Sequence, residues 1–505
     1  ASDDSAGLRA GAIAANPNGV RHDQTSFQSC GCARFDPTRQ PSPRFPPTAH
    51  RHDSVAGTRP ALMRYHARWV LPITQPPIEN GTVVENDGLI TYVGPRSVAP
   101  PGEDYDLGEA ILLPGLVNTH THLELTAMRG FLENCQFTEW IDKLRQSRNE
   151  VMDAEALLDS ARLGIAEGVE AGITTYADTC SSGVAMQAMR EAGVRGIMYQ
   201  EVFGPDPAQA EIAMRELEGR IDALLLDQTE LVALGVSPHA PYTVSDPLYD
   251  AAARFANSRE LPLAMHIAES EPEFDLVARG AGEFADRWKR RGIAVARRSR
   301  SPIALLEERG ALDRGPLLIH CVRVDPDDIA IIARRRCSVA HCPASNAKFG
   351  HGIAPLLPLL AAGIRVGIGS DSVASNNRMD ILDEARLSVL IHRAATRRHD
   401  AFGAHDALQL ATIGGARALG IDGRVGSLEP GKDADLAAFR IDIPRTIPTG
   451  DPYSAAIFAL PGRSAELVTV KGRALVKGGR ALGSDKALAP RVQAVGAALA
   501  SWAAR

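Results

Sequence analysis

The stretch GLVNTHTHLEL, residues 115 to 125, places two histidines one residue apart directly after a run of apolar residues. Alternate side chains of an extended strand share a face, so we expect His120 and His122 to point in the same direction. Two imidazoles that converge from the end of one strand suit a metal ion. The pattern fits equally well two polar residues that face water at a strand end, so the rest of the chain has to decide.

Short apolar runs separated by helix-like stretches fill residues 114–425. The runs are 115–120, 172–178, 195–200, 231–239, 261–269, 316–322, 337–343 and 365–372. Eight strand–helix units in one domain predict an α/β fold of the (β/α)8 TIM-barrel type. A doubly wound open sheet is the alternative, but no Gly-x-Gly-x-x-Gly follows the first strand.

The two flanks of this region have a different pattern. Short strands with turn residues fill 63–113, and similar segments return over 426–485. They predict one small β-sandwich domain assembled from both chain ends. Residues 1–62 are rich in Pro, Ser, Arg, His and Asp and have almost no apolar periodicity. Such a segment cannot bury enough surface to offset its ordering entropy, so we expect a disordered extension.

The overall composition is ordinary for a globular enzyme. Of the 505 residues, 45% are hydrophobic and 23% are charged, with a formal net charge of −6. No basic patch with interleaved aromatic residues indicates nucleic-acid binding. The locally basic stretch RWKRRGIAVARRSR, residues 287–300, lies between acidic segments, and we expect it to be a solvated insertion loop.

Other features concern the cellular compartment. No apolar run approaches the length of a membrane span, and the first residues lack the pattern of a secretory signal. The seven cysteines are scattered without the spacing of a disulfide framework, which favours a reducing compartment. We therefore expect a cytoplasmic protein that acts on a small molecule, with neither nucleic acid nor membrane as its partner.

Polar side chains recur at the ends of the predicted barrel strands, where TIM barrels carry their active sites. These residues are His120 and His122, then His239, then His266 and Glu269, then His320, and finally Asp371. Any one of them alone is more often a hydrogen-bonded structural residue than a ligand. Their shared position at the strand ends of one barrel predicts a metal-dependent active site.

Three imidazoles and a carboxylate form a mixed nitrogen and oxygen site for Zn²⁺, or for Fe²⁺, with room for water. Such a metal lowers the pKa of bound water from ~15.7 to about 7, which supplies a nucleophile for hydrolysis. Glu269 lies three residues beyond His266 and is well placed to move the proton. A carboxylate in the first turn of a helix is also favoured by the helix dipole.

Five segments together resemble a known family: PGLVNTHTHLELTAMRG, SPHAPYTVS, MHIAES, HCPASNAKFGHGIAPL and GSDSVASNNRMDILDEAR. They look like the amidohydrolase superfamily. More closely, they resemble the aminohydrolase branch with the methylthioadenosine/S-adenosylhomocysteine deaminases, the aminodeoxyfutalosine deaminases and the triazine hydrolases. The resemblance covers residues 64–480. It is specific for the branch and weak for the substrate.

The resemblance implies a role for each matching residue. It makes His120, His122, His266 and Asp371 the metal ligands. Glu269 becomes the proton shuttle, His320 hydrogen-bonds the attacking water or the substrate, and His239 contacts the substrate. Some relatives bridge two metals with a carboxylated lysine, but strands two to four end without lysine here. One divalent metal is therefore expected, and dimerisation is common in the branch.

Several further positions bear on the substrate. Trp140 stands 18 residues after His122, where related nucleoside deaminases hold a tryptophan against the substrate. Nine residues further on, where those enzymes hold ribose with a glutamate, this chain has Asn149 with Glu150 beside it. YQEVFGP lacks the arginine that recognises homocysteine, and Ser372 replaces a glycine usual after the aspartate. With THLEL and the insertion around 280–312, these features favour aminodeoxyfutalosine.

The sequence predicts hydrolytic deamination of an aminated heteroaromatic ring, with an adenine-type nucleoside as the favoured substrate. A methylthioadenosine/S-adenosylhomocysteine deaminase and a triazine or amide hydrolase remain alternatives, because one nucleophile serves all these leaving groups. A barrel kept only for binding is a more distant alternative. Such relatives typically lose metal ligands, whereas this chain retains all of them together with Glu269.

Overall fold

The computed structural model describes residues 62–483 and 485–504. The expected disordered extension over 1–62 therefore lies outside the described residues, apart from its last residue. Within the described ranges, no helix is both long enough and apolar enough to cross a lipid bilayer.

All eight strands predicted for the middle of the chain are present. They are β6 (Leu116–Thr121), β7 (Ile173–Cys180), β8 (Arg195–Val202), β9 (Val232–Pro238), β10 (Ala264–Ile267), β11 (Leu317–His320), β12 (Ser338–His341) and β13 (Arg365–Ile368). They pair in parallel as two sheets, β6-β7-β8-β9 and β10-β11-β12-β13. Isolated parallel bridges join Val236 to Leu263 and Thr121 to Asp371, so the two sheets touch along both margins.

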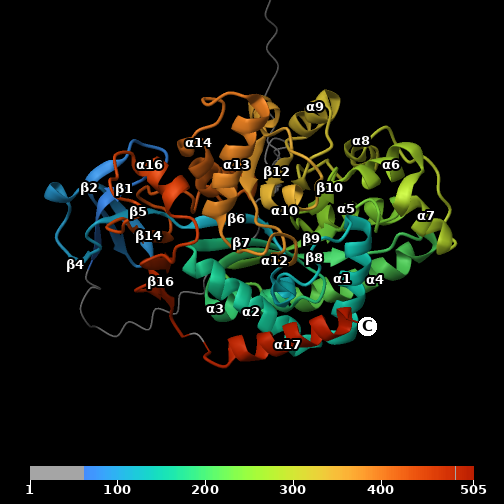
Figure 1. The fold of residues 1–505 in the computed structure, drawn as a ribbon, viewed down its shortest axis with the longest axis horizontal. Coiled ribbons are helices and arrows are strands. Elements are labelled where there is room, and N and C mark those ends of the chain that lie inside the picture. Colours follow the sequence, from blue (N-terminus) through green and yellow to red (C-terminus); the bar gives the residue numbers. More distant parts are fainter. Residues whose placement is uncertain (1–61, 484, 505) are drawn as a thin grey trace, which may run out of the picture. The chain divides into compact units, whose positions relative to one another are not determined.

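Helices surround these strands (Figure 1). The α-helices are α1 (Phe137–Val151), α2 (Ala154–Glu170), α3 (Val184–Ala192), α4 (Ala210–Leu224), α5 (Asp246–Arg259), α6 (Glu271–Arg279), α7 (Gly282–Arg290), α8 (Pro302–Glu308), α9 (Pro326–Arg334), α10 (Pro343–Lys348), α11 (Leu356–Ala361), α12 (Val373–Asn376), α13 (Ile381–Thr396), α14 (Ala404–Gln409), α15 (Gly415–Ala418), α16 (Pro452–Ser454) and α17 (Leu488–Ala503). Short 3-10 or π segments are η1 (Arg96–Val98), η2 (Leu123–Met128), η3 (Pro207–Gln209), η4 (Leu225–Asp227), η5 (Leu410–Gly414) and η6 (Ala455–Ala459).

The parallel strands are buried along their whole length rather than at alternate positions. Every residue of β7, β8 and β9 is buried, because side chains on one face fill the space between the sheets and those on the other face meet the helices. This explains why the sequence shows continuous apolar runs there. Polar side chains are concentrated at the strand ends, where the site lies.

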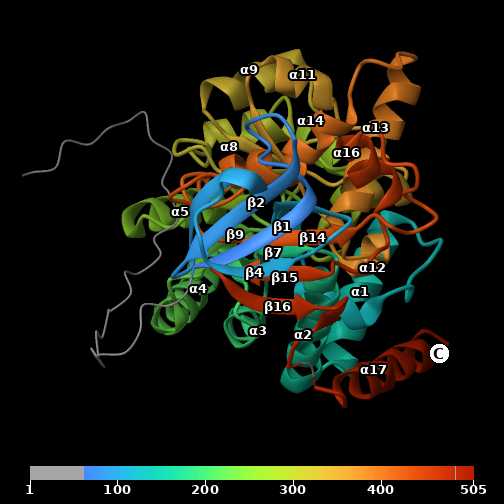
Figure 2. The same cartoon turned by 90° about the vertical axis from the view of Figure 1, so that its left-hand side faces the viewer.

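The two flanking segments form one further sheet. Its strands are β1 (Met63–Val70), β2 (Ile78–Asn86), β3 (Leu89–Pro95), β4 (Glu103–Asp106), β5 (Ala110–Pro114), β14 (Leu436–Arg440), β15 (Leu467–Val470), β16 (Arg473–Lys477) and β17 (Arg480–Ala481). The nine strands belong to a single sheet, in which β5 pairs with β14 and so joins the two chain ends. Figure 2 shows this sheet face on, with early strands in blue beside late strands in red. Its description as a sandwich domain over 63–113 and 426–485 stays a prediction.

The C-terminal helix α17 was not anticipated from the sequence. It packs against α2 and α1, along the lower edge of Figure 1. The Trp502 indole nitrogen donates a hydrogen bond of 2.7 Å to Glu150 Oε2 on α1, and the Trp502 ring lies 6.1 Å from that of Phe131. The chain end therefore supports the helix that carries Trp140.

The prediction of a solvated loop over 287–300 is right for residues 291–300, which form no helix or strand and are mostly exposed or half-buried, but wrong for the residues before them. Residues up to Arg290 belong to α7, and Trp288 is buried, with its indole nitrogen donating to the carbonyl of Tyr242 at 3.0 Å. The guanidinium of Arg298 donates to the carbonyl of Val244 at 3.0 Å and pairs with Asp246 at 2.6 Å. Among the basic residues of this insertion, Arg298 thus pairs with backbone carbonyls and a carboxylate in the segment that follows β9.

A buried ion cluster joins the parallel strands to the nine-stranded sheet. Arg195, the first residue of β8, is fully buried and donates to Asp435 at 2.9 Å and to Asp433 at 2.8 Å. Both aspartates lie directly before β14. Asp433 is also paired with Arg424 at 2.9 Å, whereas the buried Asp435 depends on Arg195 for neutralisation.

Arg195→Met is expected to lower the free energy of unfolding by about 3–5 kcal/mol, because it leaves the buried Asp435 carboxylate uncompensated. Arg190→Met removes an exposed pair with Asp227 and should cost about 1 kcal/mol or less. Urea unfolding of both variants measures the difference. Equal losses in the two variants would show that the cluster does not stabilise the fold.

Candidate metal centre and substrate pocket

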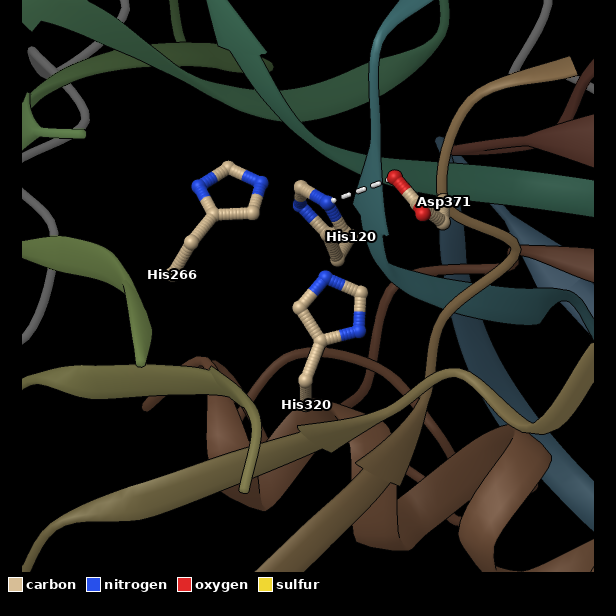
Figure 3. Close-up of side chains that lie close together, drawn as sticks. All are labelled: His120, His266, His320 and Asp371. Carbon is tan, nitrogen blue, oxygen red and sulfur yellow. Dashed lines mark hydrogen bonds and ion pairs between the residues drawn. The ribbon is translucent and has the colours of Figure 1, made fainter. Parts of the chain in front are cut away.

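Side chains from four strand ends converge on one point. His120, His266, His320 and Asp371 are buried, and their donor atoms lie within 4.8 Å of one another. Figure 3 shows the three imidazoles facing the same space, with Asp371 joined to His120. His120 Nε2 and Asp371 Oδ1 are 3.1 Å apart. The strand-end residues predicted from the sequence are thus brought together.

His122 lies at the edge of this group. Its Nε2 atom is 3.2 Å from His266 Nε2 and 3.6 Å from Asp371 Oδ1. The Thr179 hydroxyl lies 3.2 Å from its Nδ1 atom. His120 and His122 do reach the same centre from one strand, as their spacing predicts.

Backbone strain accompanies the site. Ala268, His320 and Asp371 have φ values of 51°, 77° and 58°, in the left-handed region that non-glycine residues rarely adopt. These residues follow or end β10, β11 and β13. At Gly369 a Cβ atom would lie 2.9 Å from the Cβ of His120, so only glycine lets the two chains approach closely enough for Asp371 to meet His120.

The helices after the site residues begin at defined caps. Ser270 accepts a hydrogen bond from the Glu273 amide and starts α6 directly after Glu269. Ser372 accepts from the Ala374 amide and starts α12 directly after Asp371. These caps hold each carboxylate at the junction between a strand and a helix.

Asp371 is oriented by several neighbours. Its second oxygen, Oδ2, accepts hydrogen bonds from Ser345 at 2.5 Å and from Ser375 at 2.9 Å. Burial alone would raise the pKa of Asp371, but the bond from His120 and the nearby imidazoles hold that pKa well below its usual range. Asp371 is therefore an ionised carboxylate with one oxygen directed to the centre.

Glu269 faces the same space from the opposite side. Its Oε1 atom is 3.5 Å from His320 Nε2 and 3.6 Å from His351 Nε2, and Tyr242 donates to Oε2 at 3.3 Å. Burial raises the pKa of Glu269, but His320 and His351 outweigh it and leave the pKa lowered. The backbone amide of Glu269 donates to the buried Glu273 carboxyl at 2.8 Å, which fixes its position.

The imidazoles have the protonation state that metal binding requires. Burial lowers the pKa of His120 to about 4 and also lowers the pKa values of His122 and His266. Neutral imidazoles offer lone pairs, and the Nε2 atoms of His120 and His266 lie at the centre, 3.1 Å from Asp371 Oδ1 and 3.2 Å from His122 Nε2 respectively. Neutral imidazoles with one carboxylate form a donor set that fits a divalent metal.

A cavity of about 740 Å³ opens above this centre. One wall is aromatic, with Phe137, Trp140, Tyr242 and Phe349. The other is polar, with Glu124, Arg148, Ser181, Ser182, Glu201 and Arg220. The size suits a nucleoside-sized molecule, and the two walls suit a flat ring with a polar substituent.

The residues expected to contact substrate divide into two groups. Trp140, His239 and Ser372 line the cavity. Glu150 does not: its oxygens accept from Trp502 at 2.7 Å and from Gln146 at 2.9 Å, and its neighbour Asn149 lines the cavity instead. A substrate contact from Glu150 stays a prediction that would require these bonds to break.

Two cavity carboxylates were not identified from the sequence. Glu124 accepts from Arg148 and Ser181, each at 2.9 Å, and from Ser182. Glu201, near the end of β8, is buried, and its Oε1 atom has no hydrogen-bond partner among the described residues. Its place at a strand end is the signal that identified the other site residues, and YQEVFGP contains it.

The comparisons agree with this geometry. The Amidohydrolase family model matches residues 111–475. A protein of Moorella thermoacetica named 5-methylthioadenosine/S-adenosylhomocysteine deaminase is 32% identical over 425 residues, which cover 81% of this chain and 93% of that protein.

Two solved structures are similar over most of their length. An adenosine deaminase from Xanthomonas campestris with bound zinc has a TM-score of 0.78 at 27% identity, covering 88% of this chain and all of that one. The atrazine chlorohydrolase TrzN from Arthrobacter aurescens, complexed with zinc, has a TM-score of 0.73 at 26% identity, covering 86% of this chain and all of that one.

Proposed function

Because the chain belongs to the Amidohydrolase family and is a hydrolase of carbon–nitrogen bonds other than peptide bonds, we propose that it removes ammonia from an adenine-type nucleoside. The observation that carries this proposal is that the imidazoles of His120, His266 and His320 meet Asp371 and Glu269 at the floor of one cavity. The cavity volume and its aromatic wall support a flat heteroaromatic ring.

The ligands of the proposed metal are His120, His122, His266 and Asp371, with Zn²⁺ as the metal we favour and Fe²⁺ as the alternative. A divalent ion bound there lowers the pKa of a coordinated water and so supplies the nucleophile. The zinc-containing relatives support this choice. A closed (β/α)8 barrel, supported by the bridges along both sheet margins, would place all four residues at one rim.

The residues of the chain then control the protons. Glu269 accepts a proton from the attacking water and delivers it to the ring nitrogen beside the amine-bearing carbon. The carbon–oxygen bond forms, and Glu269 then takes a second proton from the hydroxyl now on that carbon and passes it to the amine. The carbon–nitrogen bond breaks, the carbonyl forms and the amine leaves as ammonia. His320 donates from Nδ1 to Asn346 Oδ1 at 2.9 Å, which directs its Nε2 atom at the water and the developing oxygen.

The substrate contacts are assigned by position. Trp140 covers the ring from the aromatic wall, and His239 and Ser372 meet its edges. The Moorella relative favours 5′-methylthioadenosine or S-adenosylhomocysteine over aminodeoxyfutalosine. A cytoplasmic location and a homodimer complete the proposal.

Zinc-loaded protein is expected to release ammonia from at least one of adenosine, 5′-methylthioadenosine, S-adenosylhomocysteine and aminodeoxyfutalosine, with kcat/KM of at least about 10⁴ M⁻¹s⁻¹. An ammonia-coupled assay with the four compounds and a chlorotriazine measures this. Chloride release from the triazine, without ammonia release from the nucleosides, would show that the protein hydrolyses a different leaving group. Silence across the panel from metal-loaded protein would reject the nucleoside and favour a binding role.

A further inference from the structure

A buried gap separates Glu201 from His239 on the polar side of the cavity. Glu201 Oε1 and His239 Nε2 are 4.0 Å apart, which is too far for a direct hydrogen bond. Both residues line the cavity, and the Phe203 ring covers His239 with ring centroids 4.9 Å apart. A single oxygen about 2.8 Å from each atom would bridge the gap.

The hydrogen-bonding role of His239 is fixed by its neighbours. The Thr243 hydroxyl donates to the carbonyl of Ala240 at 3.1 Å, so its oxygen is available to accept from His239 Nδ1, which is 2.8 Å away. The proton of the neutral imidazole therefore lies on Nδ1, and Nε2 is an acceptor. A group that bridges the gap must donate to His239 Nε2.

The other cavity carboxylates are already engaged. Glu124 is held by an arginine and two serines, and Glu269 contacts His320, His351 and Tyr242. Glu201 differs, because its Oε1 atom is buried and has no hydrogen-bond partner among the described residues. Buried polar atoms almost always have a partner, which here has to come from a bound molecule.

We propose that Glu201 and His239 form a subsite for a hydroxyl group of the substrate, so that a sugar hydroxyl donates to His239 Nε2 and hydrogen-bonds Glu201. This inference rests on the proposed nucleoside substrate and specifies which part of it the polar wall recognises. Glu201 is thus a specificity residue rather than a group that takes part in the bond changes.

The test compares adenosine with its 2′-deoxy and 3′-deoxy analogues in wild type, Glu201→Leu and Glu201→Gln. The wild type should prefer adenosine over one deoxy analogue by about tenfold in kcat/KM. In Glu201→Leu this ratio should fall to near one, mainly through KM, whereas Glu201→Gln should retain most of it. Glu218→Leu, on the exposed face of α4, is the matched control and should behave as wild type.

Two outcomes would overturn the subsite. One is a wild type that does not distinguish adenosine from either analogue. The other is a Glu201→Leu variant that loses the same factor on all three compounds, as a purely structural role requires. Calorimetric measurement of the binding of the three nucleosides tests the hydroxyl subsite separately from the proposed deamination. A hydroxyl preference in binding that Glu201→Leu abolishes supports the subsite even if none is deaminated, and absence of that preference rejects it.

Discussion

Glu269→Gln is expected to lower kcat/KM for the best nucleoside by about 10²–10⁴-fold while leaving the fold and the metal content unchanged. The amide keeps the size of the side chain and can still accept from Tyr242. It cannot take a proton from water or return one to the substrate. The loss should appear in kcat, because proton transfer contributes to the transition state rather than to binding. Steady-state kinetics with metal analysis measures both.

Glu271→Gln provides the matched control. Glu271 lies two residues further along the chain, in the first turn of α6, where it pairs with Arg279 and Arg323 on the surface. Its replacement should change kcat/KM by less than about threefold, because exposed pairs contribute little. A Glu269→Gln variant as active as this control would remove Glu269 from the mechanism.

The strand-end residues could be predicted because two regularities coincide. Fully buried parallel strands appear as continuous apolar runs, and polar residues that recur at the ends of several such runs in one barrel predict a shared site. His120, His266, His320 and Asp371 all follow this rule and meet in space. Glu201, within YQEVFGP near the end of β8, follows the same rule, although the sequence analysis did not identify it.

The parts that escaped prediction depend on contacts between distant segments. Trp288 and Arg298 lie in a basic stretch that reads as a solvated loop, yet their partners are carbonyls and a carboxylate more than forty residues earlier. Glu150 stands next to the sequence position where relatives hold a substrate ligand. In the structure, however, it accepts a hydrogen bond from Trp502, near the C-terminal end of α17. No local pattern encodes either contact, because hydropathy and spacing describe neighbours in the chain only.

We propose that His122 binds the metal and that His320 only faces it, and the spacing of their nitrogen atoms supports this assignment. A four-coordinate metal with bonds of about 2.0–2.1 Å holds its ligand atoms about 3.3 Å apart. The distances of 3.1 Å from His120 to Asp371, 3.2 Å from His122 to His266 and 3.6 Å from His122 to Asp371 match this spacing. His320 instead directs Nε2 to Glu269 at 3.5 Å and is held by Asn346.

His122→Gln is therefore expected to reduce the metal content from about one ion per chain to a small fraction, with activity falling in proportion. His320→Gln should retain the metal and lose about 10²–10³-fold in kcat, the usual cost of removing one group that stabilises the developing oxygen. Elemental analysis of the purified variants, with zinc-dependent thermal stabilisation as a second readout, distinguishes them. If His320→Gln loses the metal while His122→Gln keeps it, then the set His120, His266, His320 and Asp371 binds the ion, and His122 moves to the position facing the substrate.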